Sequence, residues 1–345
     1  ILLDQAVSIN VVPEKTETVI DITGEFSTIN LNNMWKNSLP GYISGQAVYQ
    51  ARLSVHEKTL GEFEIDVAVE SDLKGIEVDM PLPLGKEQDQ MLPFSVEIKH
   101  HGDELSYAAK YGENLNAIVV PSINTNWRGE IRLGKGKAVL PKSGMVIKGQ
   151  LDEISIDEWL SWQEKQSVST DSAALAYIDT ISMNIGQLNA YQQQVTEVAF
   201  TAERAAQDWR ISLYSEQVKG NVNWPHKFDS ATPIIMDFDH VNLHMPKADA
   251  QVIKSAKESS QKTDLWPSIN FHTQRLHVDD MKFGEINLEA TRNKTSWELD
   301  AAILKSATIN ASVKGQWQQL ATGEQSHFKL TAASDDFRGL LADLG

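Results

Sequence analysis

The chain contains no cysteine, which excludes disulfide bonds, thiolate metal sites and a cysteine nucleophile. It is also poor in positive charge, since 31 basic residues against 47 acidic ones give a net charge of -16. Nucleic-acid binding needs clustered Lys and Arg, so the composition argues against a nucleic-acid partner. No apolar run approaches the ~20 residues of a membrane-spanning helix. We therefore expect membrane contact to occur through regions outside this chain.

Patterns for catalysis and metal binding are lacking as well. His240 and His244 are four residues apart, a spacing that suits a zinc-binding helix. The alternation of Met236 and Phe238 and the later Pro246 favour a strand at this place instead. No pairing of a nucleophile with a base stands out anywhere in the sequence. We expect neither a cofactor nor enzymatic activity.

One stretch of this acidic chain is basic. Gly134-Lys-Gly-Lys137 lacks the spacing and the Ser or Thr of a phosphate-binding P-loop, and Arg128, Arg132 and Lys142 lie near it. Two interpretations stay open. The stretch is either a solvated hairpin or a rim that contacts lipid phosphate.

The dominant pattern is alternation of apolar and polar residues with period two, which predicts β-strands with one apolar face. Phe63-Glu-Ile-Asp-Val-Ala-Val69 and Phe328-Lys-Leu-Thr-Ala332 are clear examples. Roughly twenty such runs occur, some separated by turn sequences such as Gly102-Asp103. The sequence therefore predicts a mainly β fold.

Helical patterns are few. Ser155-Ile-Asp-Glu158 is a capping box, with a helix expected from there to about Lys165. Further candidates are residues 30–39 and 334–344, the latter with apolar residues on one face. Residues 246–266 are rich in Lys, Ser, Ala and Gln and predict a mobile loop.

The sequence also contains a weak internal repeat. A shift of 88 positions places Trp209 on Trp297 and Arg204 on Arg292, in a shared apolar phase. We expect repeat units at about 177–226 and 265–317. An array of so many strands cannot be covered by a few short helices. Its apolar face must pack on a second sheet or curl into a groove that binds something apolar.

Three segments resemble the YhdP branch of the AsmA-like family of envelope proteins. They are Ser71–Lys86, the stretch from Trp266 through Phe283-Gly-Glu-Ile-Asn-Leu to Trp317, and the closing Ser334–Gly345. The resemblance implies a long twisted antiparallel sheet curled into an open apolar groove, and a periplasmic protein anchored in the inner membrane of Gram-negative bacteria. It also implies that residues 1–345 are one continuous section of a longer protein that carries phospholipid between the two membranes.

Under this reading, phospholipid is the partner and alternating strand residues are the candidate groove lining. The candidates are Ile65, Val67, Val69, Val198, Phe200, Ile211, Leu213, Ile286, Leu288, Leu299, Ile309 and Val313. The alternative is a structural or adhesive β-sandwich array that binds a protein or a glycan, in which the same residues fill a closed core.

Overall fold

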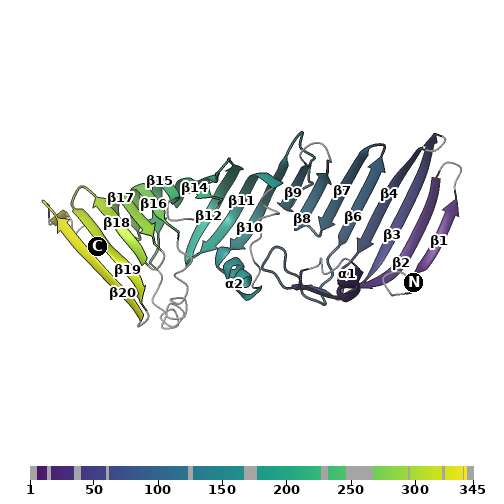
Figure 1. Ribbon diagram of the computed structural model, residues 1–345, viewed down its shortest axis with the longest axis horizontal. Helices are drawn as coiled ribbons and strands as arrows, with labels where there is room; N and C mark the ends of the chain where they lie inside the picture. Colours follow the sequence, from purple (N-terminus) through teal and green to yellow (C-terminus); the bar gives the residue numbers. More distant parts are fainter. Residues whose placement is uncertain are drawn as a thin grey trace. The chain divides into compact units, whose positions relative to one another are not determined.

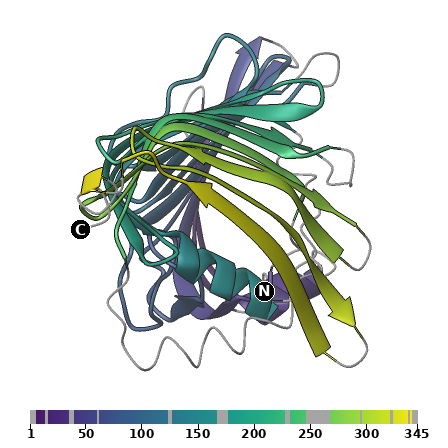
Figure 2. The same ribbon diagram turned by 90° about the vertical axis from the view of Figure 1, so that its left-hand side faces the viewer.

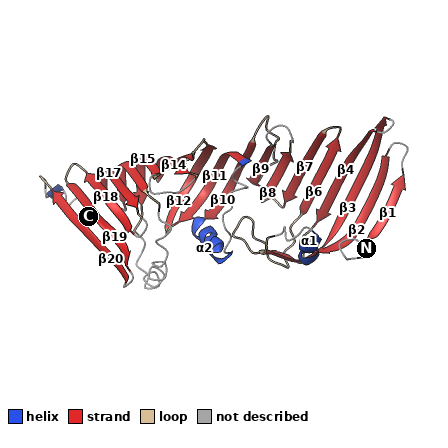
Figure 3. Cartoon of the chain, in the orientation of Figure 1, coloured by secondary structure: helices blue, strands red, loops and turns tan. Residues whose placement is uncertain are grey.

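The computed structural model describes residues 6–13, 17–34, 40–59, 62–122, 127–166, 177–226, 232–245, 267–293, 296–320, 323–336 and 338–339. Its contacts divide the chain into two compact units, Ile1–Asn184 and Ile185–Gly345. Strands predominate in both units, and the described residues form two short helices, both in the first unit (Figure 3). The prediction of a mainly β-sheet fold with few helices is confirmed.

The described residues of the first unit form ten complete strands and both helices. The strands are β1 (Ser8–Pro13), β2 (Glu17–Ser27), β3 (Ile43–Thr59), β4 (Glu62–Ser71), β5 (Ile76–Val78), β6 (Phe94–His101), β7 (Glu104–Tyr111), β8 (Leu115–Val120), β9 (Arg128–Gly134) and β10 (Met145–Ser155). The helices are α1 (Thr28–Met34) and α2 (Ile156–Gln166). The boundary between the units falls within β11 (Ile178–Ala190).

Neighbouring strands of the first unit are mostly antiparallel. The pairs run from β1–β2 through β3, β4, β6, β7 and β8 to β9 (Figure 1), and β5 pairs with β3. The β6–β7 and β7–β8 turns contain Gly102 and Gly112, whose φ angles of 60° and 56° suit glycine best. β9 and β10 are parallel. A parallel neighbour requires the chain to return from the end of β9 to the end of the sheet where β9 begins. The segment that begins with Gly134-Lys-Gly-Lys137 makes this return, so the hairpin interpretation is wrong.

The second unit contains nine complete strands in the described residues. They are β12 (Gln193–Arg204), β13 (Asp208–Tyr214), β14 (Val218–Pro225), β15 (Ile234–Leu243), β16 (Ile269–Val278), β17 (Met281–Arg292), β18 (Ser296–Lys305), β19 (Asn310–Leu320) and β20 (Gly323–Ala333). Each strand pairs with the next, and only the β15–β16 pair among them is parallel. In Figure 2 the yellow C-terminal strands bend along their length.

Helix α2 begins where the capping box predicts. The Oγ of Ser155 accepts a hydrogen bond of 3.3 Å from the backbone N–H of Glu158. This bond satisfies one of the free donors of the first helical turn. Of the other two helix predictions, residues 28–34 form α1, while residues 35–39 and most of 334–344 lie outside the described residues. The predicted loop at 246–266 also lies outside them.

Residues 72–93 of the first unit form an ordered connection. The ammonium group of Lys86 is buried and donates to the carbonyl oxygens of Ile76, at 2.7 Å, and Glu87, at 2.8 Å. Burial lowers the pKa of Lys86. The indole N–H of Trp159 donates to the backbone carbonyl of Leu82 at 3.3 Å, and that of Trp162 donates to the backbone carbonyl of Asp79. These bonds fasten α2 to the connection.

Candidate functional site

The first unit presents an apolar face that passes without interruption from strand to strand. Directly paired residues of neighbouring strands share a face of the sheet, so the register defines rows that cross it. Row A consists of Val11, Ile20, Leu53, Val67, Ile98, Tyr107, Val119, Gly129 and Met145. Row B consists of Ile9, Ile22, Ala51, Val69, Val96, Ala109, Ala117, Ile131 and Ile147. Neither row contains a charged residue over nine strands.

The second unit has an apolar face built in the same way. Row C consists of Ala202, Ile211, Val222, Met236, Phe271, Leu288, Ala302, Val313 and Leu330. Row D consists of Phe200, Leu213, Gly220, Phe238, Thr273, Ile286, Leu304, Ala311 and Ala332. Thr273 is the one polar member of the two rows. Its hydroxyl is fully buried and donates to the carbonyl of Arg275 at 3.2 Å, so it presents no free polar group.

The opposite face of the second unit is polar. Its central row consists of Thr201, Ser212, Asn221, Asp237, His272, Asn287, Ile303, Ser312 and Thr331. The ring of His272 lies 2.6 Å from the Asp237 carboxylate on this face, and Lys219 lies 2.8 Å from Asp239. The hydrogen bond from Lys219 lowers the pKa of the Asp239 carboxyl. One face of the second unit is therefore apolar and the other is polar.

Three β-bulges keep the apolar side chains on one face where the sequence changes phase. In β15, the next apolar residue on this face after Phe238 is Val241, three positions later instead of two. The pairing of β15 with β14 is irregular between these two residues. In β16 the same shift separates Thr273 from Leu276. In β18 it separates Leu299 from Ala302. A bulge adds one residue on one strand, so each bulge restores the face that a strict period of two would lose.

No second sheet covers this face in the described part of the second unit, where the elements in contact are neighbouring strands. Phe200, Leu213, Ile286 and Leu288 are half-buried on this face. A buried cluster of Val222, Ile234, Phe238 and Val241 forms within the same single layer. The sandwich arrangement needs a second layer of strands on these residues. The described residues form an apolar face of one sheet instead.

The structure places almost all the predicted lining residues on the apolar faces. Val67 lies in row A and Val69 in row B, with Ile65 two positions earlier on the same strand face. Row C contains Ile211, Leu288 and Val313, and row D contains Phe200, Leu213 and Ile286. Val198 is two residues from Phe200 and 4% exposed, and Leu299 is 8% exposed. Ile309 lies in the β18–β19 turn, one residue before β19 begins.

Several residues of the apolar faces were not predicted. Leu304 of row D, and Val241 and Leu276 beyond that row, follow the bulges, where alternation starts again in the other phase. In the sequence these places appear only as breaks in the alternation, which do not by themselves indicate a bulge. Row A also contains Tyr107 and Met145, on strands whose short apolar runs carry little periodicity.

Trp209 and Trp297 occupy corresponding places in their strands. Each is the second residue of its strand, β13 or β18. Trp209 pairs with Arg204 on the preceding strand and Trp224 on the following one. Trp297 pairs in the same way with Arg292 and Trp317. The two tryptophans therefore share the same strand environment.

The histidines near residue 240 have separate partners. The Nε2 of His240 lies 3.1 Å from the carbonyl of Glu216, whereas the Nδ1 of His244 lies 3.3 Å from Asp279. Among the described residues, no three His, Asp or Glu side chains gather in an arrangement that could hold a metal ion. None of the described helices has both the length and the apolar character that a membrane span requires.

In each unit, the described strands form a sheet with a continuous apolar face, which defines a class of extended β-sheet proteins. The YhdP protein family matches residues 2–345, and the chain belongs to that family. No similar curated protein and no similar solved structure was found.

Proposed function

We propose that this chain is a non-enzymatic section of a periplasmic lipid carrier, and that phospholipid acyl chains lie along rows A to D. The observation that carries the proposal is the continuity of these rows over nine strands in each unit. Membership of the YhdP family supports envelope lipid transport as the setting. Phospholipid is the proposed cargo, and no cofactor is needed.

The free energy of burying an acyl chain is nearly the same along a row, which favours a lipid that moves along it. Each methylene removed from water contributes about 0.8 kcal/mol, so an apolar row holds an acyl chain without specific contacts. Nine strands give eight steps of about 4.8 Å, or about 38 Å of row. One leaflet of a bilayer core is about 15 Å thick, so a row is longer than the acyl chain of one lipid. Successive positions along a row are chemically similar, which keeps the barriers to movement low.

The headgroups of such lipids stay in water beside the apolar face, because burying a charge without a partner costs several kcal/mol. Anchoring in the inner membrane and delivery towards the outer membrane are proposed for the longer protein, through segments outside this chain. The acidic surface, with a net charge of -16, agrees with this arrangement, since it disfavours broad adhesion to anionic lipid.

The proposal is tested by placing one charge in row C. Leu288 is half-buried, so Leu288→Asp should leave the sheet folded while it prevents acyl chains from passing. The measurement is photocrosslinking of a diazirine-labelled phospholipid to the purified chain, together with a thermal melt. We expect crosslinking at β17 to be lost and the melting temperature to change little.

The matched control is Ile303→Asp. Ile303 is 37% exposed and lies on the polar face of the neighbouring strand, where it pairs with Asn287. This variant should crosslink like the unchanged chain. Equal crosslinking in both variants would refute the proposed path, and a collapse of the melting temperature in Leu288→Asp would show that row C is a closed core.

A further inference from the structure

The first unit has a hollow of about 730 Å³ on the face opposite rows A and B. We call it the lysine hollow. Its floor includes Ala108 and Ile118, which pair directly with each other on β7 and β8. Lys110 and Asn116 form the next pair on the same face, and Ser95 on β6 pairs with Lys110. The connection after β9 folds over this face and adds Lys137.

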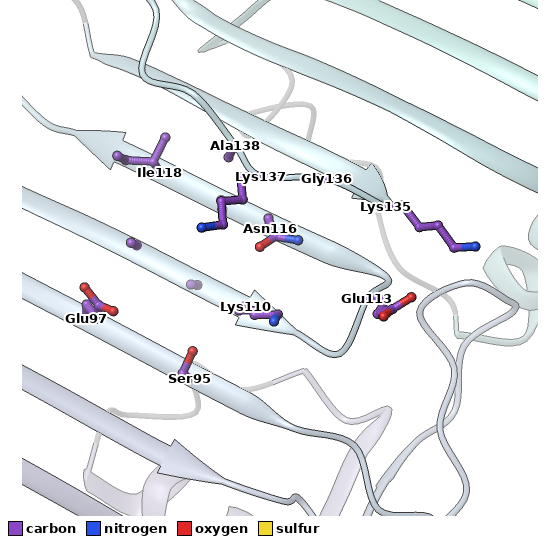
Figure 4. A pocket seen from close by; sticks show the side chains of 13 residues that line it. Ser95, Glu97, Lys110, Glu113, Asn116, Ile118, Lys135, Gly136, Lys137 and Ala138 are labelled. Atoms are coloured by element: carbon purple, nitrogen blue, oxygen red, sulfur yellow. The ribbon is translucent and has the colours of Figure 1, made fainter.

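Lys110 and Lys137 lie on either side of Asn116 (Figure 4). Both lysines are exposed, and neither has an acidic partner within ion-pair distance among the described residues. The acidic groups nearby are accounted for. Glu97 pairs with Lys99 at 3.2 Å, and Glu113 lies at the edge of the hollow, away from the two ammonium groups. In a chain of net charge -16, the hollow therefore has a local surplus of positive charge.

The connection that carries Lys137 packs against the side chain of Arg132. Gly136 has a φ of 115°, and a Cβ atom there would meet Cδ of Arg132 at 3.2 Å, so glycine allows this close approach. Arg132 is in turn paired at 2.5 Å with Glu130, which is 1% exposed. Lys148 lies 3.5 Å from the same carboxylate. The Arg132 side chain, paired with the buried Glu130, therefore packs against the backbone next to Lys137.

We propose that the lysine hollow binds a phosphate ester of a small polar molecule. The ammonium groups of Lys110 and Lys137 supply charge, and the Asn116 amide and Ser95 hydroxyl supply neutral donors to phosphate oxygens. The volume exceeds that of a bare ion, and Ala108 and Ile118 offer a small apolar floor to the rest of the molecule. Acyl chains on rows A and B lie across the sheet from this site. The site is thus independent of the proposed lipid path.

Two sources could supply this chemistry, a soluble phosphate ester or the headgroup of a lipid in a membrane surface. The first probe is sn-glycerol 3-phosphate, titrated into the full chain by calorimetry at low and high salt. The second is cosedimentation with phosphatidylcholine vesicles, with and without phosphatidylglycerol. We expect binding to weaken as salt rises, because both lysines are exposed to solvent.

The deciding variant is Lys110→Gln combined with Lys137→Gln, which should weaken binding of the probe about tenfold or more. Lys142→Gln is the control, because Lys142 is an exposed lysine of the same connection that does not line the hollow. If the unchanged chain binds glycerol phosphate and the double variant does not, the result supports a soluble ligand. Binding only to anionic vesicles, lost in the same variant, supports a headgroup. Absence of both, or binding that the double variant retains, overturns the proposal.

Discussion

At the scale of single residues, two tyrosines on the apolar face of the first unit differ in whether the hydroxyl group has a hydrogen-bond partner. Tyr49 is 7% exposed, and its hydroxyl has no hydrogen-bond partner among the described residues. The hydroxyl of Tyr111 donates to the carbonyl of Leu84 at 3.0 Å. Burial raises the pKa of both phenols. An unpaired buried hydroxyl costs free energy that a paired one largely recovers.

Tyr49→Phe should therefore stabilise the first unit by about 1 kcal/mol, because it removes an unpaired buried hydroxyl. The matched change Tyr111→Phe should destabilise it by about 1 kcal/mol, since it removes a hydrogen bond. Urea unfolding followed by circular dichroism measures both. A loss of stability in Tyr49→Phe as large as that in Tyr111→Phe would contradict the difference drawn between them.

The same tyrosines have a predictable pH dependence. The folded chain keeps the Tyr49 proton between the usual pKa of 10.0 and the raised one, whereas the unfolded chain loses it. The folded state binds more protons in that window, so the free energy of unfolding falls as pH rises through it. Tyr49→Phe should show a shallower fall above pH 10.0 than the unchanged chain.

At the scale of elements, the alternation of residues predicted the strands well, because one face of each strand is apolar and the other polar. It could not predict where bulges shift the phase, as between Phe238 and Val241, because a bulge appears in sequence only as a break in the pattern. Nor could it predict that β9 and β10 are parallel, which depends on the partner strand. The sequence singled out the basic stretch around Lys137 but not the whole lysine hollow, since Ser95, Lys110 and Asn116 come from three different strands, β6, β7 and β8.

Helix α2 provides a prediction at this scale. Ser155→Ala removes the side chain that accepts the Glu158 N–H and should destabilise the helix by about 1 kcal/mol. Amide exchange in the first turn of α2 should become faster, while exchange in β10 stays unchanged. Ser161→Ala is the control, since Ser161 is exposed in the middle of the helix. Equal effects of the two changes would mean that the cap contributes nothing.

At the scale of the whole molecule, stability comes from contacts between neighbouring strands within each of the two units. Proteins with such nearest-neighbour contacts lose cooperativity along the chain. We therefore expect the units Ile1–Asn184 and Ile185–Gly345 to respond separately to local damage.

Leu299→Asp tests this expectation. Leu299 is 8% exposed, so an unpaired carboxylate there should destabilise the second unit by about 3 kcal/mol or more. Hydrogen exchange with mass spectrometry in increasing urea should show earlier opening of β17, β18 and β19. Protection of β3, β4 and β6 should stay as in the unchanged chain. A simultaneous loss of protection in both sets of strands would show that the chain unfolds as one unit.

The bulges also bear on how sequences of this kind can change length. A pleated strand assigns side chains to faces by odd and even position, so inserting or deleting one residue exchanges the faces beyond that point. A bulge already holds one unpaired residue. It restores the assignment of side chains to faces, as a second frameshift mutation restores a reading frame. Deleting His240, between Phe238 and Val241, would leave Val241 two positions after Phe238 and on the same face without a bulge. Deleting Ile235 would instead turn Met236 and Phe238 to the polar face. Single-residue changes in length should therefore be tolerated at the bulges and rejected between them.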